Sequence, residues 1–192
     1  MANWTRRGVL AAAGGGLAAC ATQPSGLTGV PGVANIPGAE IDAAVDAALV
    51  ELYGSIKGSE TLAQRAQGVL VIPNINQLGF FAGGAYGEGA LRIRGVTVDY
   101  YSLSAVSLGF TIGAQAFNQA LFFITPEALQ QFRLADGWTL GVDAAVVVNT
   151  DGAAAGIDSA TYNRPMVEVI FGQRGLIADA SLGGAKYSRI YR

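Results

Sequence analysis

The chain has 192 residues, no histidine, one cysteine and a formal net charge of −2. Without histidine it lacks both the usual general base near neutral pH and the commonest metal ligand. Beyond the adjacent Arg6 and Arg7, its charged residues are spread singly along the sequence, whereas nucleic-acid binding needs a basic patch. We therefore expect no nucleic-acid partner, no metal site and no cofactor.

The first twenty residues have the pattern of an export signal that ends at a lipid-modified cysteine. Arg6 and Arg7 precede a short apolar run, which closes with Leu17-Ala18-Ala19-Cys20. Small residues before Cys20 give a signal peptidase access to the bond it cleaves. As a helix the run covers ~18 Å, which is too short for the ~30 Å core of a bilayer. An ordinary secretory signal with a chance cysteine is the alternative.

These features divide the chain into three parts. Residues 1–19 are expected to be a signal peptide with a twin-arginine-like start and a lipobox at its end. Residues 20–38, rich in Gly and Pro, are expected to be a lipid anchor and flexible tether, with palmitate on Cys20. Residues 39–192 are long enough to form one domain with its own core.

Acylation of Cys20 has consequences for chemistry and location. It would remove the only thiol, so the mature chain could have no disulfide, no cysteine nucleophile and no thiolate metal site. Of the 12 basic residues, loss of Arg6 and Arg7 leaves ten against 14 acidic ones, a net charge of −4. Ala21, rather than aspartate, follows Cys20. This favours a cell-envelope protein, lipid-anchored at the outer membrane and facing the periplasm.

Three helices are predicted from spacing and capping. Apolar residues recur every three or four positions over residues 41–52, with acidic residues at the other positions. A second, short helix is expected over residues 59–67 with Ser59 as its N-cap. Thr125-Pro126-Glu127 predicts the start of a third helix, which ends near Asp136-Gly137.

Alternating apolar and polar residues predict antiparallel strands. In the clearest hairpin, over residues 80–101, a turn at Arg94-Gly95 places Leu91 opposite Val98. Arg92 then lies within reach of Asp99 as a surface ion pair. The other expected strands are 69–72, ended by Pro73, then 106–116, 120–124, 138–148, and a hairpin of 166–171 and 176–182 around 172–175.

The order of these elements defines the fold class as α+β. We expect N-terminal helices and one mid-chain helix packed on antiparallel strands, which form a curled sheet, a sandwich or a partial barrel.

Two features suggest sites of chemistry but have simpler explanations. The glycines of residues 83–89 suggest a phosphate-binding loop, yet a strand rather than a helix follows them, which favours close sheet packing. Five acidic residues lie on predicted strands, where two could meet as an acid–base pair. Without a histidine or nucleophile motif, solvated strand faces are favoured. The five are Glu88, Asp99, Asp143, Glu168 and Asp179, of which the two residues 143 and 179 interrupt apolar strands.

Several motifs resemble those of one known domain family. They are Gly79-Phe80-Phe81-Ala82-Gly83-Gly84-Ala85-Tyr86-Gly87-Glu88-Gly89, Gly113-Ala114-Gln115-Ala116-Phe117, Phe132-Arg133, Asp136-Gly137-Trp138, Gly141-Val142-Asp143-Ala144, Phe171-Gly172-Gln173-Arg174-Gly175-Leu176 and Ser181-Leu182-Gly183-Gly184-Ala185-Lys186. In this order, over roughly residues 40–192, they resemble the SYLF domain of bacterial lipoproteins and of eukaryotic proteins at membranes and actin patches. The resemblance implies phospholipid binding. Lipid contact in eukaryotic members is ascribed largely to a basic segment at the start of the domain, where this chain is acidic, which argues against strong selectivity for highly charged headgroups.

The residues and the resemblance together predict a membrane-anchored lipoprotein whose SYLF-like domain binds phospholipid or a related amphiphile, without catalysis. A structural or interaction lipoprotein of the cell envelope is the alternative. The candidate lipid-binding residues are four basic residues and two adjacent aromatic ones. One of the aromatic pair is expected to be exposed, because neighbours on a strand face opposite sides. The six candidates are Lys57, Arg65, Phe80, Phe81, Arg92 and Arg94.

Overall fold

The computed structural model describes residues 36–80, 82–108, 113–135, 137–139, 145–148, 157, 161–175 and 185–192. Asn35–Arg192 form one compact unit, to which all the elements below belong. The predicted signal peptide, Cys20 and most of the predicted tether lie outside the described residues, as do Phe81, Asp143 and Asp179.

The described residues form an α+β fold, as the sequence predicts. In chain order the elements are α1 (Gly38–Ser55), α2 (Ser59–Arg65), β1 (Gly68–Phe80), β2 (Ala82–Ile93), β3 (Val96–Leu108), β4 (Gly113–Phe123), α3 (Pro126–Leu134), β5 (Trp138–Thr139), β6 (Ala145–Val148), the 3₁₀ helix η1 (Thr161–Asn163), β7 (Met166–Gly175) and β8 (Lys186–Ile190).

The strands form a single curled sheet with the order β5-β8-β3-β2-β1-β4-β7-β6. The pairs are antiparallel, except that β6 and β7 are parallel. Residues 140–144 join the two edge strands β5 and β6, so their joined ends lie within about 21 Å of each other. In a flat sheet of eight strands the edges would be about 34 Å apart. The predicted curled sheet is thereby confirmed.

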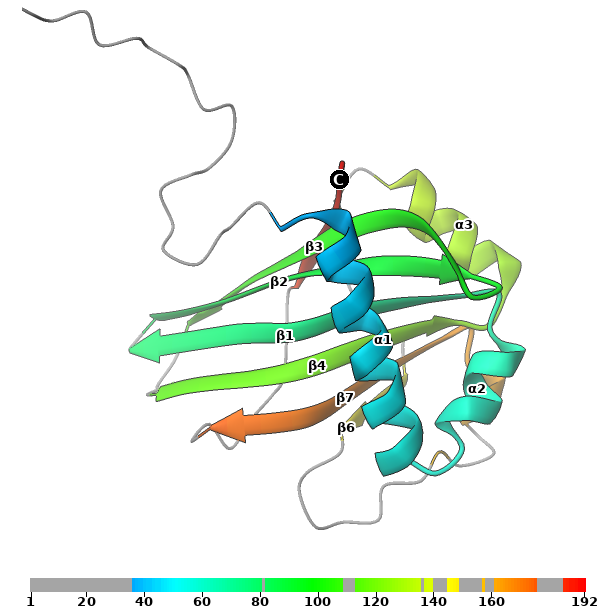
Figure 1. Cartoon of the computed structure of the whole chain (residues 1–192), viewed down its shortest axis with the longest axis horizontal. Coiled ribbons are helices and arrows are strands. Elements are labelled where there is room, and N and C mark those ends of the chain that lie inside the picture. The colour runs from blue at the N-terminus through cyan, green and yellow to red at the C-terminus, as the bar shows by residue number, and fades with distance from the viewer. Residues whose placement is uncertain are drawn as a thin grey trace, which may run out of the picture. The chain divides into compact units, whose positions relative to one another are not determined.

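The curl produces an inner and an outer face, and both are buried. On the inner face, Gln119 of β4 donates a hydrogen bond of 2.8 Å to the Tyr187 hydroxyl of β8, although three strands separate β4 from β8. The helices α1 and α2 cover the outer face, as Figure 1 shows for α1 lying across the strands. The helix α3 packs against the inner face through Phe132, which is 1% exposed.

The helices follow the sequence pattern closely. The residues of α1 that are buried against the sheet are those predicted from the spacing, Ile41, Val45, Ala48 and Leu52. The Thr125 hydroxyl accepts a hydrogen bond from the Ala128 N–H at 3.2 Å and caps α3, with Pro126 at the first helical position. The predicted cap of α2 is wrong. Gly58 is the N-cap, and the buried Ser59 hydroxyl instead donates to the Ile56 carbonyl at 2.7 Å.

The strand predicted to end at Pro73 continues to Phe80. A bulge between Ile72 and Ile75 absorbs the proline, because register is lost there against both neighbouring strands. Asn74 adopts a positive φ of 50°, and its N–H donates to the Asn118 side-chain oxygen at 2.9 Å. A side chain of β4 thus replaces the strand bond that the bulge removes.

The hairpin of β2 and β3 has the predicted turn but not the predicted register. Arg94 and Gly95 have φ values of 53° and 79°, and Ile93 pairs with Val96, as expected. A register shift after Arg92 then places Leu91 opposite Asp99 rather than Val98. The prediction assumed that only one face was buried, whereas Ala90 and Leu91, on opposite faces, are both fully buried.

Three further strand predictions are wrong, two of them because a continuous pattern spans a change of strand partner and the third because a bulge, not a turn, lies there. Residues 106–116 divide between β3 and β4, which are separated in the sheet by β2 and β1. Residues 138–148 divide between β5 and β6, at opposite edges. Residues 172–175, predicted as a turn, continue β7 along β4 through a bulge. Residues 176–182 lie outside the described residues.

Candidate functional site

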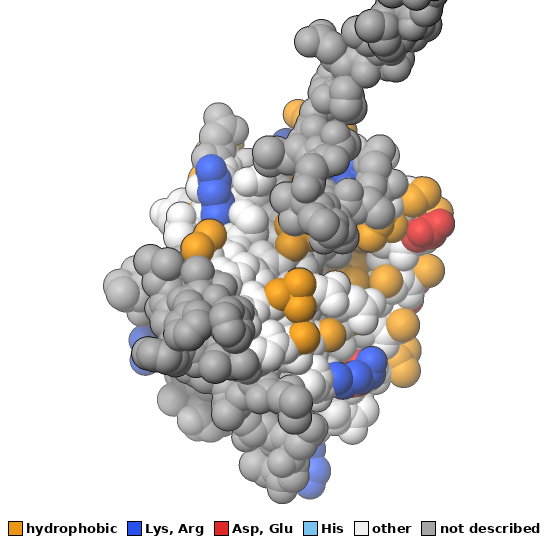
Figure 2. Space-filling model, turned by 90° about the vertical axis from the view of Figure 1, so that its left-hand side faces the viewer, with side chains coloured by type: hydrophobic (Ala, Val, Ile, Leu, Met, Phe, Trp, Pro, Cys, Tyr) orange, Lys and Arg blue, Asp and Glu red, His pale blue; other side chains and the backbone are white. Residues whose placement is uncertain are grey.

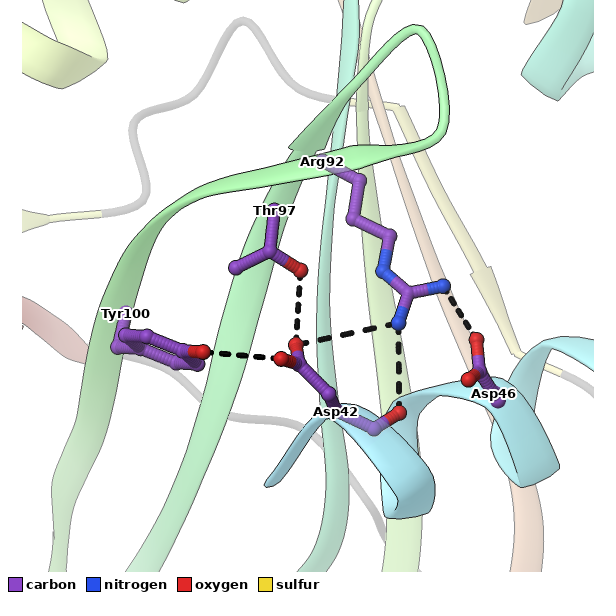
Figure 3. A network of polar contacts seen from close by, with 5 residues as sticks. All are labelled: Asp42, Asp46, Arg92, Thr97 and Tyr100. Carbon is purple, nitrogen blue, oxygen red and sulfur yellow. Dashed lines mark hydrogen bonds and ion pairs between the residues drawn. The ribbon is translucent and has the colours of Figure 1, made fainter. Parts of the chain in front are cut away.

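A polar network fixes α1 to the β2–β3 hairpin (Figure 3). The Asp42 carboxylate accepts hydrogen bonds from the Thr97 hydroxyl at 2.7 Å and from the Tyr100 hydroxyl at 2.9 Å. The Arg92 guanidinium donates to the Asp46 carboxylate and, at 3.3 Å, to the Asp42 carbonyl oxygen. Burial and the bond to Asp42 raise the pKa of Tyr100, so its hydroxyl is a donor at neutral pH.

This network changes the interpretation of Arg92. The predicted pair of Arg92 with Asp99 is wrong, because the register shift after Arg92 moves Asp99 and because Arg92 is held by the carboxylates of α1. The Arg92 side chain is 15% exposed and is enclosed by these contacts. It is therefore part of the contact that holds α1 on the sheet, and is not available to a ligand.

Asp99 instead joins α3 to β8. Its Oδ2 atom lies 3.2 Å from Arg133 Nη2 and 3.4 Å from Arg189 Nη2. Arg189 Nη2 also donates to the Arg133 carbonyl oxygen at 3.3 Å. One carboxylate thus contacts two guanidinium groups, which leaves this cluster with a net charge of +1.

These two arginines line a groove beside the tip of the β2–β3 hairpin. The groove has a volume of about 630 Å³ and is bounded by the hairpin, α3 and β8. We call it the cationic groove, and its lining residues are Gln67, Ile93, Arg94, Pro126, Leu129, Gln130, Arg133, Leu134 and Arg189. Leu134 is 76% exposed at the end of α3. The lining thus combines apolar side chains with three guanidinium groups.

The cationic groove has a positive charge that its surroundings do not neutralise. Arg94 has no ion pair or side-chain hydrogen bond within the described part of the chain. With the Asp99 cluster at +1, the groove carries a net charge of +2. The groove therefore attracts an anionic group. Guanidinium groups form bidentate hydrogen bonds with the oxygens of a phosphate or carboxylate group.

The sequence-predicted lipid residues do not gather in one place. Arg94 lines the cationic groove, whereas Arg92 belongs to the α1 network. Arg65, on α2, lies over the Tyr162 ring with 4.8 Å from its guanidinium carbon to the ring centroid. Lys57 is exposed between α1 and α2. Phe80 is the last residue of β1, and Phe81 lies outside the described residues.

Arg133 and Arg189, which the sequence prediction omitted, come from α3 and β8. A local signal existed for Arg189. The final segment from Lys186 to Arg192 contains three basic residues and no acidic one. For Arg133 the useful sign is its position beside Phe132, whose burial fixes α3 and thereby places the guanidinium.

Two of the acidic strand residues are buried, contrary to the predicted solvated faces. The Glu88 carboxylate, on β2, accepts hydrogen bonds from Arg192 Nη2 at 2.5 Å and from the Tyr86 hydroxyl at 2.6 Å. Glu168, on β7, lies on the inner face and accepts a hydrogen bond from Gln119 Nε2. Both faces of the sheet are covered, so an acid on either face can be enclosed. No group of acidic residues among the described positions is arranged to hold a metal ion.

The opposite end of the sheet has a different surface (Figure 2). Orange hydrophobic side chains lie in the middle of the described part of this face among white polar ones, and separate blue groups lie around them. Leu78 and Val106, which are 62% and 72% exposed, both lie opposite Gly84 in the cross-strand register. The cationic groove, with its three arginines, lies beside α3 instead. None of the helices among the described residues is long and apolar enough to cross a membrane.

The chain thus contains an α+β domain with a curled sheet and the cationic groove beside α3. Residues 104–190 match the family model Ysc84, described as "Las17-binding protein actin regulator", which represents the SYLF domain family. The resemblance seen in the sequence is thus confirmed over this range. The matched range contains α3 and β8, and therefore Arg133 and Arg189.

The chain also resembles one curated protein over most of its length. Over 148 residues, 77% of this chain, the sequence is 24% identical to Beta cell expansion factor A of Aeromonas veronii. The match covers 55% of that protein, so the chain spans about half the length of this relative.

Proposed function

We propose that this chain is a membrane-anchored lipoprotein, held by an acylated Cys20, whose domain binds phospholipid or a related amphiphile without catalysis. The observation that carries the lipid-binding part is the cationic groove. It places the apolar side chains of Ile93, Leu129 and Leu134 next to guanidinium groups. An amphiphile with an anionic headgroup needs this combination, because its chain requires apolar contact and its headgroup requires positive charge.

Two further observations support the proposal. The SYLF family, matched over residues 104–190, is associated with lipid binding. The lipobox ending at Cys20 and the predicted tether would bring the domain close to a membrane surface. An envelope location of the outer-membrane type, facing the periplasm, follows from the same leader and from Ala21.

Vesicle flotation tests the lipid-binding part. The chain from Ala21 onward, which keeps the whole compact unit Asn35–Arg192 but has neither the acyl group nor the predicted signal peptide, is mixed with phosphatidylcholine vesicles with or without one-fifth phosphatidylglycerol. A basic residue near an anionic surface contributes about 1 kcal/mol, so Arg94→Gln should weaken binding about fivefold. Because apolar contacts also contribute, binding should fall only a few-fold between low and physiological salt.

The matched control is Arg164→Gln, an exposed arginine outside the cationic groove. It removes the same charge and should leave binding unchanged. Leu134→Asn should weaken binding equally at low and high salt, because it removes apolar contact alone. If no vesicle binding occurs at any salt, the proposal is wrong, and the structural or interaction role becomes the better hypothesis. A collapse of binding at physiological salt would contradict the apolar contribution.

A further inference from the structure

A second hollow shares Arg133 and Arg189 with the cationic groove. We call it the β8 pocket. It has a volume of about 410 Å³, and its lining residues are Tyr101, Arg133, Ala135, Gly137, Lys186, Ser188, Arg189 and Tyr191. Like the cationic groove, it has three cationic side chains in its lining, and it adds two aromatic hydroxyls, those of Tyr101 and Tyr191.

The Tyr101 hydroxyl is the unusual group of this pocket. Tyr101 is 3% exposed, and its hydroxyl donates no hydrogen bond within the part of the chain that the structure describes. Burial raises the pKa of Tyr101, and the neighbouring Arg189 guanidinium, which can only donate to the phenol oxygen, partly opposes this rise. The ring is held against Phe132 with 4.7 Å between ring centroids, and the Arg189 guanidinium carbon lies 6.0 Å from its centroid. Buried hydroxyl groups are nearly always hydrogen-bonded. Tyr101 therefore presents an unused donor beside a cation.

The Lys186 side chain packs directly against Gly137. A Cβ atom at Gly137 would lie 2.3 Å from Lys186 Cε. Gly137 also has a φ of +82°, a backbone conformation that residues with a side chain rarely adopt. The Lys186 ammonium group has no ion pair with any described residue. Since Arg133 and Arg189 share Asp99, the pocket carries a net charge of +2.

We propose that the β8 pocket binds a phosphate group, with Arg133, Lys186, Arg189 and the Tyr101 hydroxyl as donors. Guanidinium groups donate to two phosphate oxygens at once, ammonium acts as a point charge, and the phenol supplies a neutral donor. The pocket and the cationic groove share two arginines, so a phosphate bound here has apolar lining beside it. The phosphate of a phospholipid fits the β8 pocket while its acyl chains lie in the cationic groove, so we take a phospholipid as the ligand; this identification rests on the proposed function. Free inorganic phosphate could make the same contacts with the pocket.

Calorimetric titration with inorganic phosphate, at constant ionic strength, tests the pocket directly. The protein is again the chain from Ala21 onward. Tyr101→Phe keeps the ring and its packing and removes only the hydroxyl. We expect it to weaken phosphate binding about tenfold, and Lys186→Met to weaken it at least tenfold. Arg164→Met, which removes an exposed charge outside the pocket, should have no effect.

Vesicle binding distinguishes the two sources. If Tyr101→Phe and Lys186→Met weaken binding to vesicles containing phosphatidic acid as well as to inorganic phosphate, the pocket holds a lipid phosphate. If they weaken only inorganic phosphate binding, the pocket holds free phosphate and lies apart from the lipid site. If phosphate does not bind, or if Tyr101→Phe binds it unchanged, the inference is wrong. The proposed function would survive that result if Arg94→Gln and Leu134→Asn still weakened vesicle binding.

Discussion

Glu168 offers the sharpest test of the enclosed inner face. The residue is 1% exposed, and its carboxyl group accepts a hydrogen bond from Gln119 Nε2. The other atom of that amide, Gln119 Oε1, is buried without a partner. Burial raises the pKa of Glu168, and the bond from Gln119 only partly opposes this. A protonated Glu168 would carry an O–H that can supply the donor which the amide oxygen lacks.

The sign of the resulting pH dependence follows from this raised pKa. Below the ordinary value of 4.5 the carboxyl group is protonated in both the folded and unfolded states. Above it the unfolded chain loses the proton while the folded protein keeps it, so the free energy of unfolding falls as pH rises toward the folded pKa. The slope is at most about 1.4 kcal/mol per pH unit.

Glu168→Gln should abolish this dependence, because an amide is neutral at every pH and can donate to Gln119 Oε1. Urea unfolding of both proteins at pH 4, 5.5 and 7 measures the difference in free energy of unfolding. We expect a small difference at pH 4 that grows with pH in favour of the glutamine variant. Glu127→Gln, at an exposed carboxylate in α3, is the control. A difference that stays constant, or that shrinks as pH rises, would refute a protonated Glu168.

The remaining predictions concern export, anchoring and the seat of α3. Cys20→Ser should abolish incorporation of labelled palmitate, and continued labelling would disprove the lipobox. Replacing Arg6 and Arg7 with lysine should block export if the twin-arginine receptor reads the pair; unchanged export would indicate the general secretion route. Phe132→Ala removes a ring that contacts Tyr101 and Trp138, and should destabilise the protein by about 3–5 kcal/mol. The melting temperature would then fall by roughly 6–20 °C, and a change within the error of calorimetry would contradict the role of Phe132 in seating α3.

The helices could be predicted because their signals are local. The spacing of residues 41–52 and the sequence Thr125-Pro126-Glu127 depend on nothing beyond neighbouring residues. Strand partners could not be predicted in this way. The alternation of apolar and polar residues continues unchanged where the chain passes from one strand to the next. Residues 106–116 and 138–148 are therefore each predicted as one strand, although each range belongs to two strands.

The cationic groove could not be predicted, for a related reason. Arg94, Arg133 and Arg189 are far apart in the sequence, and only the seating of α3 beside the hairpin and β8 brings them to one groove. Because both faces of the sheet are buried, the usual expectation that polar residues of a strand face solvent does not hold here. Glu88 and Glu168 are enclosed by different faces of the same sheet, and neither could have been located from alternation alone.

The acidic character of α1 explains why the positive charge lies at α3 and β8. The carboxylates of Asp42 and Asp46 face the β2–β3 hairpin, where they hold Arg92 and accept bonds from Thr97 and Tyr100. In this chain α1 therefore serves to cover the sheet, and its apolar side is buried there. A surface of this domain that attracts an anion must therefore be formed by other elements. Three of its cations, Arg133, Lys186 and Arg189, lie within residues 104–190, the range that carries the family likeness.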